Sequence, residues 1–186
     1  ILLIDEYDVP MARATSNGYY KEMLEIMKGF MQALKDNQCI KLAVITGCLK
    51  IAKESIFTGT NNFVSNTITS SRLNEYYGFV QSEVDRILED AEIKGKGDVM
   101  KKWYDGYHFG DVDVYCPWDV MCYVDDLQKN PDAKPDEYWK DTSDNAIIRS
   151  FIDYAGASIT KKLETLMNGG YIIQRVDENL TYDYLH

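Results

Sequence analysis

The chain has 186 residues and a formal net charge of −10, and 45% of its residues are hydrophobic. This length and composition predict one globular domain or two small ones. The negative charge argues against a surface that grips a nucleic-acid backbone, because such a surface must be basic.

The first element is an apolar run, Ile1–Ile4, that leads directly into Asp5 and Glu6. A strand with every position apolar is predicted to be buried on both faces, as in the parallel sheet of an α/β domain. Ligands of such sheets bind beyond the carboxyl ends of the strands, where the two acids would emerge. An apolar strand followed by Asp-Glu is the Walker B pattern of P-loop ATPases, whose Asp holds Mg²⁺ and whose Glu activates water. Taken alone, the pattern fits a helix N-cap or a solvated strand end equally well.

The next segments predict a crossover between two parallel strands. Residues 9–18 contain Pro, Ser, Asn and Gly, and this composition predicts a loop. Apolar residues then recur at helical spacing from Tyr19 to Asn37, and the methionines among them are expected to fill a core. Ile40–Thr46 is a second short apolar run. Strand, helix and strand with tight connections predict a parallel sheet, so the second strand would end at the same edge as the two acids.

The remainder of the chain predicts mainly helices. A polar stretch over residues 51–72 is long enough to be a functional or mobile loop. Residues 171–173 and 180–185 alternate in polarity like a β-hairpin. Helices are predicted over residues 82–93, 98–107, 117–127, 143–154 and 158–167.

The cysteines and the absence of a signal peptide bear on the cellular compartment of the protein, and the first residue bears on whether the chain is a segment. The four cysteines, Cys39, Cys48, Cys116 and Cys122, form no C-x-x-C pair. This indicates reduced core thiols of a cytoplasmic protein and not metal ligands. No apolar run approaches the roughly 20 residues of a membrane span, and no signal peptide is recognisable. An initiator methionine is also missing, so we expect the chain to be a segment of a longer protein.

Several motifs occur together in the order found in one known family. They are Leu3–Pro10, Thr46-Gly47 with Lys53–Phe57 and Asn61-Asn62, Tyr76–Phe79, Trp103–Gly110 with Tyr115 and Pro117-Trp118, and Tyr138-Trp139 with Thr142, Ser143 and Asn145. This ordered set, which covers nearly the whole chain, resembles the AAA-ATPase-like family of predicted bacterial and archaeal ATPases. Members of that family are similar to STAND-type P-loop ATPases and frequently carry a C-terminal nuclease domain of the PD-(D/E)XK type.

The resemblance implies an α/β fold in three parts. Residues 1–79 would be the C-terminal part of a P-loop ATPase core with a parallel sheet. Residues 80–168 would form a mainly helical lid, and residues 169–186 a hairpin that starts or forms the wing of a winged-helix element. The aromatic residues of the lid would fill its core or, in part, contact the nucleotide: Trp103, Tyr104, Tyr107, Phe109, Tyr115 and Trp118.

The resemblance also implies roles for individual residues. Asp5 is expected to bind Mg²⁺ and Glu6 to be the catalytic glutamate. Lys50 is the candidate sensor that stabilises charge on the γ-phosphate. Thr46 is a second sensor candidate, and Asp8 either assists the nucleotide site or has a structural role. ATP and Mg²⁺ are the cofactors implied for the complete protein.

The Walker A pattern G-x-x-x-x-G-K-[ST] does not occur in the sequence. The resemblance places it upstream of Ile1, so we expect this chain alone to hydrolyse ATP no faster than background. The expected partners are the nucleotide and a nuclease domain or protein partner, with no direct nucleic-acid binding and no membrane.

Two alternatives stay open at this point. One is a non-catalytic interaction module that keeps the ATPase fold and uses its methionine-rich helix and aromatic lid as docking surfaces. The other is a hydrolase in which Asp5, Glu6 and Asp8 bind a metal ion directly.

Overall fold

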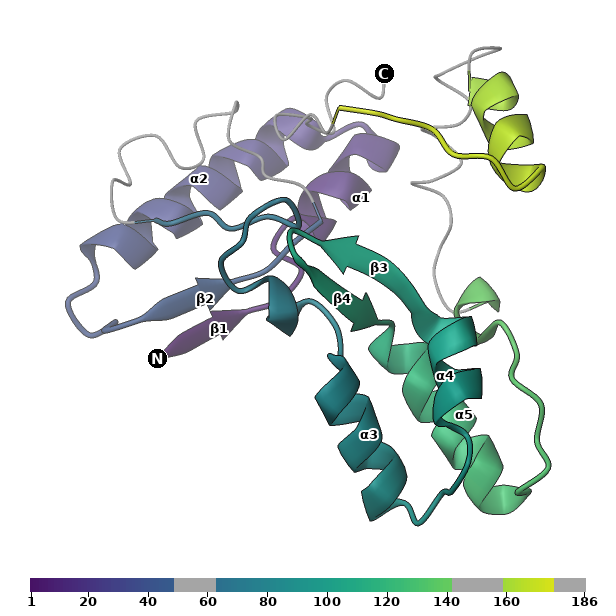
Figure 1. Ribbon diagram of the computed structural model, residues 1–186. Coiled ribbons are helices and arrows are strands. Elements are labelled where there is room, and N and C mark those ends of the chain that lie inside the picture. The colour runs from purple at the N-terminus through teal and green to yellow at the C-terminus, as the bar shows by residue number, and fades with distance from the viewer. Residues whose placement is uncertain (49–62, 142–158, 176–186) are drawn as a thin grey trace. The chain divides into compact units, whose positions relative to one another are not determined.

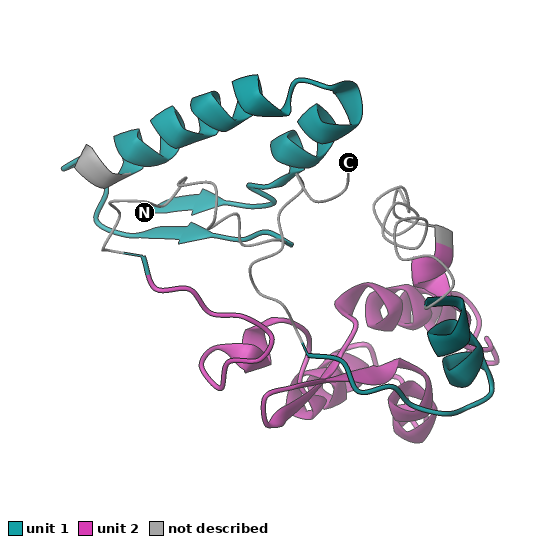
Figure 2. Ribbon diagram, turned by 90° about the horizontal axis from the view of Figure 1, so that it is seen from above, with its two compact units in different colours: residues 1–63, 145–186 teal, residues 64–144 magenta. Residues whose placement is uncertain are grey.

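The computed structural model describes residues 1–48, 63–141 and 159–175 (Figure 1). The chain divides into two compact units, of which unit 1 comprises residues 1–63 and 145–186 and unit 2 comprises residues 64–144 (Figure 2). A parallel pair of strands lies in unit 1 and an antiparallel hairpin in unit 2, so the architecture is mixed α/β. The three-part domain organisation, with boundaries after residues 79 and 168, stays a prediction.

Unit 1 contains the predicted parallel crossover. Strand β1 (Leu2–Ile4) pairs in parallel with β2 (Ala43–Ile45), and Ile4 is the register partner of Ile45. Helices α1 (Val9–Asn17) and α2 (Tyr20–Asp36) connect the two strands. The prediction of a parallel sheet is therefore confirmed for these strands.

The two-stranded sheet is covered on one face. Figures 1 and 2 show α1 and α2 on the same side of the strands. Leu3 and Val44, which are register partners, are 73% and 46% exposed. The prediction that the first strand is buried on both faces is wrong for the described chain, because the helices pack on one face. The core beneath them contains Tyr7, Met11, Leu24, Met27 and Met31.

The loop predicted over residues 9–18 is instead helix α1. Pro10 lies in its first turn, where a missing N–H breaks no intrahelical hydrogen bond, and Gly18 ends it in the left-handed conformation with φ of 78°. Polar side chains near its end bond within the helix. Thr15 Oγ1 donates to the Met11 carbonyl at 3.0 Å, and the Asn17 amide donates to the Arg13 carbonyl at 2.7 Å. The residues that suggested a loop therefore mark a helix start, a helix end and internal bonds.

Unit 2 combines helices with a hairpin. Its elements are η1 (Asn74–Tyr76), α3 (Gln81–Asp90), α4 (Gly97–Tyr104), β3 (Asp105–Phe109), β4 (Val112–Tyr115), α5 (Pro117–Lys129) and η2 (Tyr138–Asp141), where η marks a 3₁₀ helix. The helices predicted over residues 82–93 and 117–127 correspond to α3 and α5. The helix predicted over residues 98–107 is wrong beyond Tyr104, because the following residues pair with β4 around a turn at Gly110, whose φ is 62°.

Two of the family motifs pack together in unit 2. Phe79 and Tyr115 exchange main-chain hydrogen bonds of 3.1 and 2.8 Å. A Cβ atom on Gly78 would lie 2.5 Å from the Tyr115 carbonyl oxygen, so only glycine permits this approach. The buried Asn74 amide donates to the Phe109 carbonyl and to Asp111 Oδ1, each at 2.8 Å. The Tyr76–Phe79 motif thus supports the hairpin.

The core of unit 2 contains part of the predicted aromatic set. Tyr104 and Tyr115 are buried, and the Tyr104 ring contacts the rings of Tyr123 and Tyr138. Trp103, Tyr107 and Trp118 are about half exposed, so the prediction that all six aromatics fill the core holds only in part. The buried cluster consists of Val84, Leu88, Met100, Tyr104, Tyr115, Val120, Tyr123, Val124 and Leu127.

The C-terminal segment is described only in part. Residues 159–167 are helical, in agreement with the helix predicted over residues 158–167. Residues 171–175 show no strand, and residues 180–185 lie outside the described ranges, as do the helix predicted over residues 143–154 and the motif residues Lys53–Phe57, Asn61, Asn62, Thr142, Ser143 and Asn145. The winged-helix element therefore stays a prediction. Within the part of the chain that the structure describes, no helix is long and apolar enough to cross a membrane.

Candidate functional site

The carboxyl ends of β1 and β2 bring the predicted acids and Thr46 to one edge. Asp5 follows Ile4 and Thr46 follows Ile45, and these two isoleucines are register partners. The Thr46 N–H donates to the Ile4 carbonyl at 2.9 Å, and the Tyr7 N–H donates to the Thr46 carbonyl at 3.0 Å. The main chain after each strand is thus bonded to the other.

The Thr46 hydroxyl connects the two acidic residues. Thr46 Oγ1 donates to Asp5 Oδ1. The Glu6 N–H lies 3.0 Å from Asp5 Oδ1 and 3.4 Å from Thr46 Oγ1, so its proton points toward both oxygens. All three residues are exposed to solvent. The edge therefore presents the Thr46 hydroxyl, the Asp5 carboxylate and the main-chain N–H of Glu6 in one hydrogen-bonded group.

Glu6 adopts an unusual backbone conformation. Its φ of 51° lies in the left-handed region, which non-glycine residues rarely occupy. Strained residues of this kind are held by their surroundings, and here the Glu6 carbonyl accepts the Val9 N–H at 3.1 Å. The turn that starts α1 therefore holds Glu6 at the exposed edge.

Asp8 is buried and makes different contacts from Asp5 and Glu6. It is 1% exposed and caps the start of α1, where its carbonyl accepts the Met11 and Ala12 N–H groups. Its carboxylate Oδ1 accepts the Cys48 N–H at 3.1 Å. The structure brings together Asp5, Glu6 and Thr46 at the surface, with Asp8 beside the segment that follows β2. Lys50 lies outside the described residues.

The donor set at the edge fits Mg²⁺ bound together with a nucleotide. Mg²⁺ takes oxygen ligands and commonly binds through one or two carboxylates plus phosphates and water, which Asp5 and the Thr46 hydroxyl match. The described residues contain no group of three or more His, Cys, Asp or Glu side chains that could hold a metal ion. A hydrolase using Asp5, Glu6 and Asp8 as direct ligands is therefore not supported by this geometry.

Gly47 and Cys48 belong to this region although they were not singled out from the sequence as site residues. A Cβ atom on Gly47 would lie 2.6 Å from Asp8 Oδ1 and from the Tyr7 ring. The pKa of Cys48 is raised by partial burial and then by the carboxylates of Asp8, Glu6 and Asp5. A raised pKa keeps the thiol protonated and argues against a nucleophile. The glycine directly after an apolar strand was the available signal, since such glycines often mark close backbone approach.

The prediction about cysteines is confirmed only in part. All four cysteines lie in the described residues, and none forms a disulfide. Cys39 and Cys48 are exposed, whereas Cys116 and Cys122 are partly buried. The prediction that the thiols are core residues is thus wrong for the exposed Cys39 and Cys48, and none of the four cysteines belongs to the buried clusters of the described chain.

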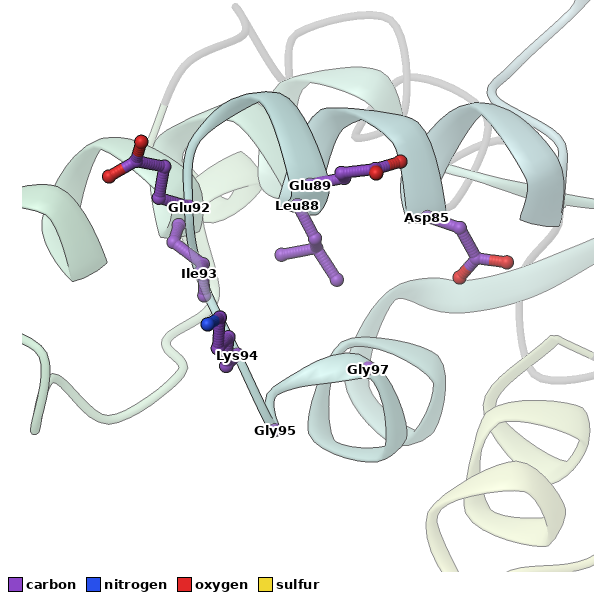
Figure 3. A pocket seen from close by; sticks show the side chains of 8 residues that line it. All are labelled: Asp85, Leu88, Glu89, Glu92, Ile93, Lys94, Gly95 and Gly97. Carbon is purple, nitrogen blue, oxygen red and sulfur yellow. The ribbon is translucent and has the colours of Figure 1, made fainter.

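A surface hollow in unit 2 does not resemble a nucleotide site. It lies between α3 and the start of α4 (Figure 3). Its lining includes the exposed acids Asp85, Glu89 and Glu92 and one lysine, Lys94. The hollow does not lie at the carboxyl end of a parallel strand, where nucleotides bind in α/β folds. The carboxyl edge of β1 and β2 in unit 1 is therefore the better candidate site.

Comparison with known proteins adds a family to this geometry. Residues 1–57 match the AAA-ATPase-like family, described as predicted AAA-ATPase. The matched segment includes β1, β2 and all the residues of the acidic edge.

A longer protein resembles most of the chain. An "Uncharacterized protein in vnfD 5'region" from Azotobacter chroococcum mcd 1 is 26% identical over 170 residues, which cover 90% of this chain and 31% of that protein. The chain thus spans about a third of the length of this relative. No solved structure matches the chain.

Proposed function

We propose that the chain carries the acidic part of the ATP-hydrolysing centre of an AAA-like ATPase. The observation that carries this proposal is the hydrogen-bonded group at the carboxyl edge, in which Thr46 Oγ1 donates to Asp5 and lies 3.4 Å from the Glu6 nitrogen. The family match over residues 1–57 includes this group. A parallel sheet with acids at its carboxyl edge is the expected site of a nucleotide in an α/β fold.

Each residue of the edge has a proposed part in the chemistry. Mg²⁺–ATP, when bound, supplies the phosphoryl group and a cation that neutralises phosphate charge. Asp5 would hold the ion through a carboxylate oxygen. Glu6, exposed and without a salt bridge among the described residues, would orient the attacking water and accept its proton. Thr46 keeps the Asp5 carboxylate oriented and is the proposed sensor of the γ-phosphate.

The phosphate-binding loop, the lid and the coupled partner of the proposed ATPase lie in other segments. Because the sequence contains no Walker A pattern, the backbone amides that cradle the phosphates would come from outside these 186 residues. Residues 80–168 are the proposed lid, and the buried cluster within residues 84–127 supports a packed core for part of it. We propose that ATP binding drives a switch coupled to a nuclease domain or another protein partner.

Substitutions at the edge test this function in the complete protein. We expect Glu6→Gln to bind ATP with nearly unchanged affinity but to hydrolyse it about 100-fold more slowly or worse, because proton transfer and water orientation are lost. Asp5→Asn should weaken binding in the presence of Mg²⁺ more than in its absence. Titration with a fluorescent ATP analogue and a phosphate-release assay measure both effects.

The matched control is Glu25→Gln on α2, which removes an exposed carboxylate that pairs with Lys28 at 2.8 Å. It should leave binding and turnover unchanged. If Glu6→Gln turns over ATP at the wild-type rate, Glu6 has no part in hydrolysis and the proposal fails.

A non-catalytic interaction module is the second candidate function. The observation that favours it is the exposure of large aromatic side chains in unit 2, where Trp103, Tyr107 and Trp139 are 49%, 51% and 52% exposed. In the methionine-rich helix, Met27 and Met31 are buried, whereas Ile26 and Phe30 are 63% and 44% exposed. A complete protein that binds no ATP by the titration above would favour the module.

A further inference from the structure

Three contacts join the segment after β1 to the segment after β2, and the buried carboxylate of Asp8 makes one of them. The first joins Asp5 Oδ1 to the Thr46 hydroxyl, and the second joins the Tyr7 N–H to the Thr46 carbonyl at 3.0 Å. The third joins Asp8 Oδ1 to the Cys48 N–H at 3.1 Å, across 40 residues of sequence. These contacts hold the segment after β2 along the loop between β1 and α1.

Gly47 makes the third contact possible. It lies between Thr46 and Cys48, and a Cβ atom there would be 2.6 Å from both Asp8 Oδ1 and the Tyr7 ring. Real Cβ atoms do not approach other atoms so closely, so any side chain at this position would push the two segments apart. The close approach at Gly47 and the hydrogen bond of the Cys48 N–H are therefore two parts of the same contact between the segment after β2 and the loop after β1.

We infer that Asp8 is a positioning residue of the proposed ATPase site and not a ligand of the nucleotide or its metal ion. This inference rests on the proposed function. At 1% exposure the carboxylate is not presented to solvent beside Asp5. Its bond to the Cys48 N–H fixes the main chain two residues beyond Thr46, and through it the Thr46 hydroxyl that orients Asp5.

The position of Asp8 at the start of α1 fits this role. A buried carboxylate is costly unless it is hydrogen-bonded, and the N-terminus of a helix offers partial positive charge. The contact requires an acceptor oxygen rather than a negative charge as such. Asparagine keeps that oxygen and alanine removes it, so the two substitutions separate positioning from ligation.

The first test measures the contact in the 186-residue chain without nucleotide. Hydrogen exchange followed by mass spectrometry reports the protection of the Cys48 amide. We expect Asp8→Ala to reduce this protection roughly tenfold, because one hydrogen bond is lost, and Asp8→Asn to restore most of it. Asp98→Ala is the matched control, since Asp98 is an exposed acid in the first turn of α4.

Alkylation of Cys48 by iodoacetamide gives a second readout in the same samples. Asp8→Ala should label Cys48 faster, because the segment opens and a neighbouring negative charge is removed. The exposed Cys39 is the internal reference and should not change. Unchanged exchange and labelling of Cys48 in a folded Asp8→Ala protein would overturn the inference.

The second test uses the complete protein and distinguishes the two possible failures. Asp8→Ala should lower ATP turnover, and Asp8→Asn should restore most of it, whereas a true metal ligand would lose Mg²⁺-dependent binding in both variants. Loss of that binding in Asp8→Asn with Cys48 still protected would overturn positioning. If the wild-type protein binds no ATP, the proposed function fails, and the exchange test still decides the contact.

Asp8→Asn also covers the case in which Asp8→Ala does not fold, as judged by circular dichroism. Gly47→Ala is then the companion variant, because it strains the same contact from the opposite side. It should increase exchange and labelling at Cys48 with Asp8 intact. Wild-type protection of Cys48 in a folded Gly47→Ala protein would contradict the inference.

Discussion

Tyr115 links three parts of unit 2 through one residue. Its main chain pairs with Phe79, its ring lies in the buried cluster, and its hydroxyl donates to Gln81 Oε1. Burial raises the pKa of Tyr115 to about 12, and the carboxylates of Asp105 and Asp85 add to this. A buried phenol that must stay neutral makes folding dependent on pH.

The stability of unit 2 should therefore fall in alkaline solution. An unfolded tyrosine ionises near pH 10, whereas folded Tyr115 stays neutral up to about pH 12, so the unfolded state gains stability between these values. Below about pH 10 the contribution is fully present. For one such group the loss is at most about 1.4 kcal/mol for each pH unit in this window.

Urea unfolding of Tyr115→Phe at about pH 8 and about pH 11 measures this effect. The variant should lose less free energy of unfolding between the two pH values than the wild type, because phenylalanine cannot ionise. Tyr76→Phe makes the same chemical change at a 75% exposed position and serves as the control. An equal pH dependence in wild type and Tyr115→Phe would contradict the assignment.

At the scale of single elements, α1 and α2 of unit 1 each have a glycine, but one lies at the helix end and the other in the helix interior. Gly18 ends α1 with φ of 78°, a conformation that residues with a side chain rarely adopt. Gly29 lies within α2 with an ordinary φ, and a Cβ atom there would have no neighbour within 4 Å. The first glycine is required by its helix, and the second weakens its helix.

Alanine substitutions at these glycines should therefore change stability in opposite directions. We expect Gly29→Ala to raise the free energy of unfolding by about 0.5–1 kcal/mol, because alanine has the higher helix propensity. Gly18→Ala should lower it by about 1 kcal/mol, because the left-handed conformation strains alanine. Urea unfolding followed by far-UV circular dichroism measures both, and a stabilised Gly18→Ala would refute the assignment of Gly18 as the helix end.

At the scale of the whole molecule, unit 2 contains a core of its own. All residues of its buried cluster come from residues 64–144, and the hairpin, η1 and α5 supply contacts within the same range. Tyr104 closes this core by hydrogen bonds of 3.1 Å to the main chain of Asp136. A unit with a complete core is expected to fold alone.

Residues 64–144 expressed alone should unfold cooperatively in urea. Met100, which is fully buried, provides the internal test. Met100→Ala should cost about 2–5 kcal/mol in the isolated unit and a similar amount in the same transition of the whole chain. Near-UV circular dichroism monitors the urea transition of the isolated unit. A non-cooperative transition would mean that unit 2 needs other residues to fold.

Several features followed from residues close together in the sequence. The apolar runs at each end of a helical segment predicted a parallel pair, and the acids after the first run predicted the edge at which Asp5, Glu6 and Thr46 now lie. Helix α1 was missed because Pro10 and Gly18, which begin and end it, were interpreted as loop residues. The strand β3 was missed because its pairing with β4 forms only around the turn at Gly110.

By itself, the sequence determined that two apolar strands end in polar residues at a common edge, because chain order and the period of apolar residues dictate a parallel crossover. The tertiary structure alone decided which acids are exposed and which is buried. Asp5, Glu6 and Asp8 are nearly adjacent in the chain, yet Asp8 alone is buried, with its carboxylate against Gly47. That difference depends on contacts across 40 residues, which no local pattern of side chains encodes.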